Sequence, residues 1–253
     1  MATAADPQIV ETLPDIAWRN VEAGEVAIEL DDGPSRKFSV LPFHISRYPI
    51  TNEQYQCFIN AGGYDTQQWW KDLEKPVIEP SNWQHKNRPR TNACWYEAMA
   101  YCRWLTDQIG DGIKITLPEE QQWLLAATGG RERPYPWPDQ KGTPVSHLAN
   151  VDGSDEDKGH HLGQTSAVGL YPNGDSATGI SDLAGNVWEW CLNRHDDIDY
   201  TLPDFSEGSP GARVLRGGSW LDDPENAAPA DRRRARPGPR SYDIGFRLVC
   251  ALP

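Results

Sequence analysis

The spacing of apolar residues predicts regular elements in the first half of the chain and few in the second half. Short alternating runs at 26–28 and 38–40 lie on either side of Asp32-Gly33-Pro34, a combination that predicts a β-hairpin. Residues 43–45 predict a further strand. Beyond residue 130 no helical spacing recurs, so turns and short strands are expected from there on.

Two short helices are predicted from their end signals. Thr51 and Gln54 form a capping-box pattern, and the helix that they open should close at Gly62-Gly63. The run Thr116-Leu117-Pro118-Glu119 combines a second capping box with proline at the first helical position. Its helix should stop at Gly129-Gly130.

The clearest amphipathic helix is predicted between Trp95 and Gly110, where apolar residues recur at helical spacing. Residues 1–15 carry no pattern and are expected to be a flexible leader. Residues 16–253 are expected to form a single domain, because no linker or internal repeat interrupts them. Helices followed by a long irregular half indicate the α+β class.

Composition adds that the core should be aromatic and wrapped by loops. The chain has 22 glycines and 21 prolines among 253 residues, and only 38% of its residues are hydrophobic. Eleven tryptophans compensate for the scarcity of aliphatic side chains, because each aromatic ring buries a large area.

The formal net charge of −13 argues against nucleic acid and against an anionic membrane surface as partners. No apolar run approaches the roughly 18 residues of a membrane span, and the N-terminus lacks the pattern of a signal peptide. Five scattered cysteines without a C-x-x-C motif are typical of reduced thiols, so we expect a cytoplasmic protein without membrane insertion.

Five separate stretches resemble one family in their order and spacing. The chain is similar in these stretches to the sulfatase-modifying factors, which include formylglycine-generating enzyme. The matching stretches are Tyr48-Pro49-Ile50-Thr51-Asn52-Glu53-Gln54-Tyr55, Leu117-Pro118-Glu119-Glu120-Gln121-Gln122-Trp123, Asp182-Leu183-Ala184-Gly185-Asn186-Val187-Trp188-Glu189-Trp190, Arg213-Val214-Leu215-Arg216-Gly217-Gly218-Ser219-Trp220 and Gly245-Phe246-Arg247.

The resemblance implies a C-type-lectin-like fold with little regular secondary structure. It also implies copper chemistry at two cysteines after the Gly-Gly-Ser motif, but the matching positions here are Asp222 and Ala227. Related sulfoxide synthases carry iron on a histidine cluster from another domain, and the six histidines here show no H-x-x-x-H spacing. We therefore expect no catalytic residues and a chain that is not an enzyme.

Calcium is the one cofactor that the resemblance suggests. Asn186, Val187 and Glu189 match the second calcium site of the family, where amide, carbonyl and carboxylate oxygens suit a hard cation. Asn150 and Val151 match the first site, whose acidic ligand is missing downstream. The alternative is structural: Asn186 would cap a turn, and Glu189 would pair with an arginine.

Residues 221–243 depart from the family although their flanks match it, and about 213–250 resemble the variable region of retroelement-diversified proteins. In such proteins, asparagine codons of a template are copied with errors at adenines. The residues at eleven positions here are reachable in that way, and these are the expected ligand-binding positions: Leu221, Asp222, Asp223, Asn226, Asp231, Arg233, Ala235, Arg236, Ser241, Tyr242 and Asp243.

Tyrosine, serine, aspartate and arginine are residues that binding loops favour, so the partner should be an unknown protein ligand. Arg232 and Arg234 belong to the fixed framework and are expected to point inward, which explains the arginine run without nucleic acid. Three other interpretations stay open. The segment is an ordinary divergent loop, the chain is a divergent family enzyme or pseudo-enzyme, or it is a sensor module without a diversified surface.

Overall fold

The computed structural model describes residues 13–29, 34–110, 112–138, 142–153, 161–196 and 211–251. Most of the leader predicted over 1–15 lies outside these residues, as do Asp32-Gly33 of the hairpin turn and His160. The single domain predicted over 16–253 stays a prediction.

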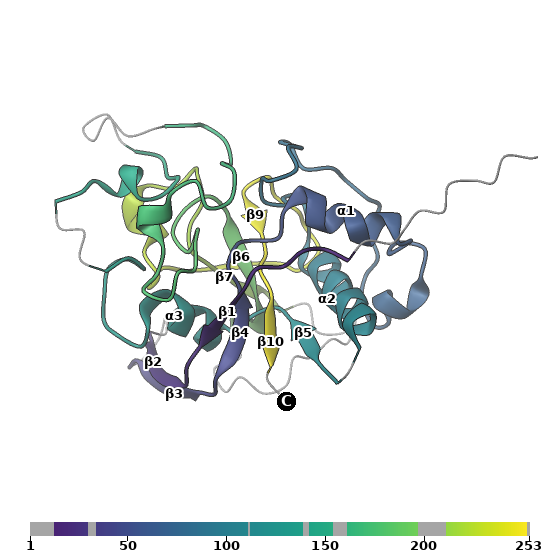
Figure 1. The fold of residues 1–253 in the computed structure, drawn as a ribbon, viewed down its shortest axis with the longest axis horizontal. Helices are drawn as coiled ribbons and strands as arrows, with labels where there is room; N and C mark the ends of the chain where they lie inside the picture. Colours follow the sequence, from purple (N-terminus) through teal and green to yellow (C-terminus); the bar gives the residue numbers. More distant parts are fainter. Residues whose placement is uncertain are drawn as a thin grey trace, which may run out of the picture.

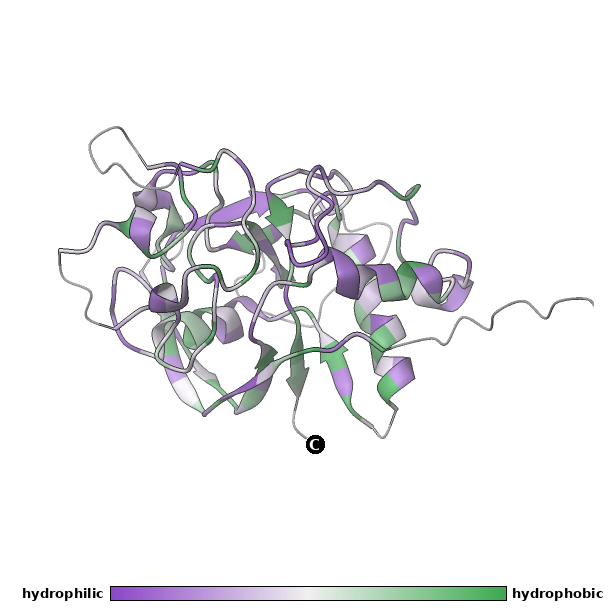
Figure 2. Ribbon diagram, turned by 45° about the horizontal axis from the view of Figure 1, so that its top comes forward, coloured by the Kyte–Doolittle hydropathy of each residue, from purple (hydrophilic) through white to green (hydrophobic). Residues whose placement is uncertain are grey.

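A four-stranded antiparallel sheet occupies the middle of the molecule (Figure 1). Its order is β1 (Trp18–Val21), β4 (Phe43–Ser46), β10 (Val249–Ala251) and β5 (Lys114–Thr116). The strand from the end of the chain therefore lies between two strands from the first half. Figure 2 shows this strand as hydrophobic along its length, which agrees with its place inside the sheet.

The predicted hairpin is confirmed as a two-stranded sheet. β2 (Gly24–Ile28) pairs antiparallel with β3 (Arg36–Val40), with Val26 opposite Phe38. Helix α3 (Glu120–Thr128) packs on this hairpin, on the other side of the central strands from α1 and α2 (Figure 1).

The sequence between 188 and 245 forms the third sheet, in the order β8, β7, β6, β9. β6 (Trp188–Arg194) pairs antiparallel with β7 (Arg213–Arg216) and parallel with β9 (Ile244–Gly245). β8 (Arg232–Ala235) is an edge strand beside β7. Short 3-10 helices fill the loops: η1 (Gln67–Trp70), η2 (Val145–His147), η3 (Pro172–Gly174) and η4 (Pro224–Ala227).

Helices α1 (Asn52–Asn60) and α2 (Trp95–Ile109) confirm the helices predicted after Thr51 and between Trp95 and Gly110. The capping box at Thr51 is also present. The predicted start of the third helix at Thr116 is wrong. Thr116 is the last residue of β5 and pairs with Val249, so it remains in the sheet. The cap is Glu119 instead, which exchanges hydrogen bonds with Gln122.

The core is aromatic, as the composition predicts. Its larger cluster joins α1 and α2 to the third sheet, and rings such as Tyr55, Tyr101 and Phe246 stack or meet edge to face in it. A second cluster lies between α3, the hairpin and β6. Among the residues described above, no helix is both long enough and apolar enough to span a bilayer.

Candidate functional site

Two buried ion pairs hold the segment between Arg232 and Arg240 onto the helices. The Arg232 guanidinium donates to both carboxylate oxygens of Glu120 at 2.8 and 3.1 Å, at the start of α3. The Arg240 guanidinium donates to both oxygens of Glu97 at 2.8 and 2.7 Å, in the first turn of α2. Both carboxylates are fully buried, so the two ends of the segment are fixed on the helices.

The predicted inward orientation is thus confirmed for Arg232 and wrong for Arg234, which is exposed. β8 is an edge strand, and both Arg233 and Arg234 on it are exposed to solvent.

A sharp turn after β7 brings Asp222 inside the protein. Gly218 has a φ of +71°, and a Cβ there would lie 2.7 Å from the Ala227 Cα, so only glycine fits without strain. Asp222 was predicted as an exposed ligand-binding position, but it is buried. Its carboxylate accepts hydrogen bonds from Trp188 Nε1 at 2.7 Å and from the backbone and hydroxyl of Ser219 at 3.0 and 2.6 Å.

Asp222 also positions an exposed arginine. Its second carboxylate oxygen lies 2.6 Å from the Arg233 guanidinium, whose carbon stands 4.6 Å from the centre of the Trp188 ring. The Arg233 side chain is nevertheless 47% exposed. A cation that is stacked and paired in this way loses little conformational entropy when it binds a ligand.

Three aromatic rings gather at Trp220, two positions before the Asp222 that pairs with this arginine. Trp83 meets Trp220 edge to face at 5.2 Å and Tyr242 at 6.5 Å, and Trp220 lies 5.9 Å from Tyr242. Trp220 is 9% exposed, whereas Tyr242 and the neighbouring Leu221 are 43% and 40% exposed. We call the surface formed by Trp83, Trp220, Leu221, Arg233 and Tyr242 the C-terminal face.

Trp83 was missed as a site residue, since it lies about 140 positions before the others, in a proline-rich loop. The two segments are joined at Asn92, at the end of that loop, which has a φ of +53° and donates its backbone N–H to the Ser241 carbonyl. Only the folded structure brings the two segments together.

Ten of the eleven predicted ligand-binding positions are at least partly exposed. Asp222 is the buried exception. The exposed positions are Leu221, Asp223, Asn226, Arg233, Arg236 and Tyr242, and the partly buried ones are Asp231, Ala235, Ser241 and Asp243.

The residues predicted to bind calcium are engaged with protein groups. Glu189 is fully buried, and its oxygens accept two bonds of 2.6 Å from Arg247 and one of 2.7 Å from Trp123 Nε1. Asn186 has a φ of +66°, and its side-chain oxygen accepts the Ser166 N–H at 2.9 Å. Val187 is buried beside them. Because arginine occupies the carboxylate, these residues do not fit a calcium ion, and the alternative of a capped turn and an ion pair describes them.

A buried carboxylate lies next to this turn. Asp182, with a φ of +56°, accepts the Gly169 N–H at 2.7 Å. Burial raises the pKa of Asp182 to about 6, although the Gly169 N–H and the Arg247 guanidinium act in the opposite direction.

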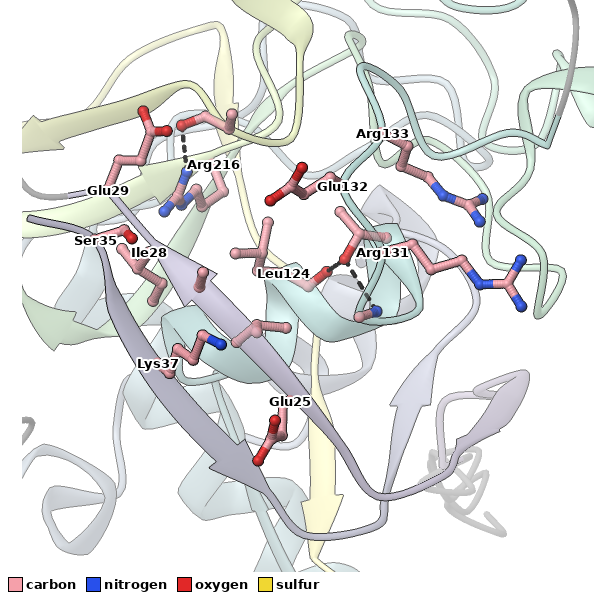
Figure 3. Close-up of a pocket in the computed structure, with 15 residues that line it drawn as sticks. Glu25, Ile28, Glu29, Ser35, Lys37, Leu124, Arg131, Glu132, Arg133 and Arg216 are labelled. Carbon is pink, nitrogen blue, oxygen red and sulfur yellow. Dashed lines mark hydrogen bonds between the residues drawn. The ribbon is translucent and has the colours of Figure 1, made fainter.

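A cavity of about 520 Å³ opens between the β2–β3 hairpin and α3 (Figure 3), and Ala230, next to the predicted Asp231, is part of its lining. Its lining mixes acidic side chains, Glu25, Glu29 and Glu132, with basic ones, Lys37 and Arg216. Figure 3 shows Arg131 and Arg133 directed away from its centre. None of the predicted site residues lines it.

Comparison with known proteins settles the family. A model described as the sulfatase-modifying factor enzyme 1-like domain matches residues 3–252. The chain belongs to the sulfatase-modifying-factor family. The predicted family and its mixed α+β fold are therefore confirmed.

Relatives of this sulfatase-modifying-factor domain include an enzyme. The hercynine oxygenase of Mycobacterium tuberculosis is 30% identical over 262 residues, which are 90% of this chain and 57% of that protein. The chain spans about half the length of the hercynine oxygenases that it matches.

Two solved structures share the fold of the sulfatase-modifying-factor domain. PvdO from Pseudomonas aeruginosa superimposes with a TM-score of 0.71 at 22% identity and covers 93% of this chain and 94% of its own. Treponema denticola variable protein 1 superimposes with a TM-score of 0.67 at 22% identity and covers 92% and 94%.

The expectation that the chain is not an enzyme is wrong, because relatives named hercynine oxygenase match it over most of its length. That expectation rested on two missing cysteines and on the lack of H-x-x-x-H spacing among the histidines. The absence of the cysteines excludes only thiolate-bound copper at one place, which is a single chemistry within the sulfatase-modifying-factor family.

The positions of those cysteines do not fit copper. The Asp222 carboxylate is occupied by Trp188, Ser219 and Arg233, and the Ala227 side chain carries no donor atom and packs in a small apolar cluster. Across the described ranges, no three histidine, cysteine, aspartate or glutamate side chains gather as metal ligands. No reaction step is therefore assigned to a metal on these residues.

Proposed function

We propose that the chain is the substrate-recognition part of a divergent sulfatase-modifying-factor enzyme, and that its C-terminal face binds a polypeptide segment of the substrate. The observation that carries the proposal is the aromatic group of Trp83, Trp220 and Tyr242 together with the exposed, stacked Arg233, whose partner Asp222 lies two positions after Trp220. Tryptophan, tyrosine and arginine are the residues that most often dominate the energy of a protein interface.

The geometry favours an extended ligand over a small one. Tyr242 and Leu221 stand out from the surface, whereas the cavities of about 520, 560 and 430 Å³ have none of the C-terminal face among their lining residues. A partner that lies across protruding side chains contacts several of them at once, as a polypeptide does. The anchors at Glu97 and Glu120 keep the face in place before binding, so less ordering entropy is lost.

The chemical step is left to groups beyond the C-terminal face. Asp222 and Ala227 supply no copper ligands there. The related hercynine oxygenases are about twice as long as the matched region, so a comparable enzyme has room for a reactive centre in another part.

The test selects ligands without assuming their identity. A displayed library of random peptides is panned against the protein, and the affinity of each selected peptide is measured for the wild type and for Tyr242→Ala, Arg233→Ala and Leu41→Ala. We expect Tyr242→Ala to weaken binding by about 2 kcal/mol, roughly thirtyfold. Leu41, 81% exposed on the turn before β4, is the control and should change nothing.

Two results would contradict the proposal. One is that the selected peptides bind the Tyr242→Ala and Arg233→Ala variants as well as the wild type. The other is that calorimetry detects hercynine binding that Tyr242→Ala abolishes, which would make the small substrate of the relatives the ligand of the face.

A second candidate function is the display of a diversified surface, and the exposure of the predicted ligand-binding positions favours it. Ten of the eleven predicted positions are accessible to some degree, while the framework residues Trp220 and Arg232 are held by packing and by Glu120. We propose that a retroelement diversifies these positions. Sequencing the DNA around the gene tests this. We expect a near-repeat of the DNA for residues 213–250 that differs at adenines and lies beside a reverse-transcriptase gene. The absence of such a repeat would refute the diversification of these positions.

A further inference from the structure

The indole nitrogens of the buried tryptophans differ at one place, which lies in the C-terminal face. Five of these nitrogens donate to an oxygen atom at 2.7–3.0 Å, namely those of Trp70, Trp95, Trp123, Trp188 and Trp190. Across the part of the chain that the structure describes, Trp220 carries the one covered indole nitrogen without a hydrogen-bond partner. A covered donor without an acceptor costs free energy, so an oxygen supplied by a ligand would gain a hydrogen bond here.

The neighbours of Trp220 explain why its N–H has no partner. The Asp222 carboxylate, two positions further on, already accepts from Trp188 and Ser219 and pairs with Arg233. Trp83 and Tyr242 pack against Trp220 through their rings. A contact between an N–H group and a ring face is weaker than an N–H···O bond. An oxygen that entered this group of rings would therefore replace a weaker contact with a stronger one.

The acceptor that suits this place is uncharged. Aromatic rings pack against the Trp220 indole, and Arg233, the cation of the C-terminal face, is already paired with Asp222. The chain as a whole also carries a formal net charge of −13. A carboxylate would lose its hydration here without gaining an unpaired cation, whereas an amide carbonyl loses much less.

Tyr242 is the ring that can make room for such a group. Its side chain is 43% exposed, whereas Trp83 is only partly exposed and Trp220 is 9% exposed. Rotations of side chains are common when two partners bind, even where the backbone stays in place. We therefore expect Tyr242 to move on binding, while Trp220 keeps its position.

We propose that Trp220 Nε1 donates a hydrogen bond to a main-chain carbonyl oxygen of the bound polypeptide. This inference rests on the proposed function of the C-terminal face and names the chemical group that is recognised there. Every polypeptide carries main-chain carbonyls. A donor on the framework residue Trp220 thus binds the feature that all ligands share, while exposed positions such as Leu221 and Tyr242 contact the ligand side chains.

Nuclear magnetic resonance of the indole N–H groups tests the wild-type protein directly. The probe is N-methylacetamide, a small model of the main-chain amide, and the Trp220 resonance is assigned as the one that is lost in Trp220→Phe. N-methylacetamide should shift this resonance downfield and leave that of Trp188, which is already bonded to Asp222, unchanged. Acetate at the same concentration should shift the Trp220 resonance much less.

A substitution that removes only the N–H group tests the bound polypeptide. In Trp220→benzothienylalanine, a sulfur atom replaces the N–H group and the ring system keeps its size. Peptides selected on the wild type should bind this variant roughly three- to tenfold more weakly, as for the loss of one hydrogen bond. Its melting temperature should not fall, because the Trp220 N–H makes no bond in the free protein. The matched control, Trp188→benzothienylalanine, should melt at a lower temperature, because Asp222 loses a donor.

The inference is overturned if N-methylacetamide shifts the Trp220 and Trp188 resonances equally, if it shifts neither, or if acetate is as effective. A bound water on the Trp220 N–H that N-methylacetamide does not displace would overturn it as well. If selected peptides bind Trp220→benzothienylalanine as tightly as the wild type but lose affinity for Tyr242→Ala, the proposed function stands and this inference fails. If panning yields no peptide that depends on Tyr242, the proposed function itself fails, and this inference fails with it.

Discussion

The ion pair of Glu189 and Arg247 gives the sharpest test of how this fold is stabilised. Both side chains are fully buried. Beyond its two bonds to Glu189, the Arg247 guanidinium donates to four backbone carbonyls, those of Ser46, Arg47, Ser181 and Asp182, at 3.0–3.2 Å. One side chain therefore joins the end of β4 in the central sheet to the loop before β6.

Arg247→Met removes the cation and keeps most of the volume. The Glu189 carboxylate is then left buried with Trp123 Nε1 as its remaining side-chain donor. Breaking a buried pair at one partner costs about 3–5 kcal/mol, so we expect the free energy of unfolding to fall by that amount. Adding Glu189→Gln removes the uncompensated charge but keeps an acceptor for Trp123, so the double variant should recover at least about 1 kcal/mol relative to additivity.

Urea denaturation followed by tryptophan fluorescence measures these changes, with the slope of the transition checked for constancy. The control is Lys86→Met, which breaks the exposed pair with Glu53 at 2.9 Å and should cost at most about 1 kcal/mol. The reasoning is refuted if Arg247→Met costs no more than Lys86→Met, or if the effects of Arg247→Met and Glu189→Gln are additive.

Three further outcomes are expected. Replacing Leu221, Asp223 and Arg236 together by serine should change the free energy of unfolding by no more than about 0.5 kcal/mol per site. Trp220→Ala should lower it by about 3–5 kcal/mol, because that ring is buried. Thermal melts in which the triple variant and Trp220→Ala lose equal stability would contradict the separation of surface residues from framework residues. The raised pKa of Asp182 means that the folded state binds more protons than the unfolded state between about pH 4 and 6. Stability relative to the Asp182→Asn variant should therefore rise as the pH falls from 7 to 4, by up to about 3 kcal/mol, and parallel pH profiles would refute this. Excess chelator should leave the melting temperature unchanged, because arginine occupies the predicted calcium carboxylate, and a clear decrease would restore calcium as a ligand.

Local signals were enough to predict most of the regular elements. The capping box at Thr51 and the apolar spacing from Trp95 each depend on residues within one or two turns, and both helices form where they were predicted. The start of α3 could not be predicted in the same way. Thr116 carries a good capping pattern, but its pairing with Val249, more than 130 positions away, keeps it in a strand.

The same distinction between local and distant information applies to the candidate site. Exposure of Tyr242 and Leu221 was anticipated from the sequence, whereas burial of Asp222 was not, because it depends on donors from Trp188 and Ser219 and on a turn at Gly218. The part played by Trp83 is visible only once the loop before α2 is seen against the C-terminal segment.

The place of β10 between β4 and β5 has a consequence for how the protein is made. While the chain emerges from the ribosome, the first half exposes two strand edges with no partner, and the carboxylates of Glu97 and Glu120 have no arginine beside them. These contacts span more than 100 positions, so they form late and make folding slow. Nascent chains that stop before β10 should depend on chaperones, because the native sheet cannot close until β10 has been made.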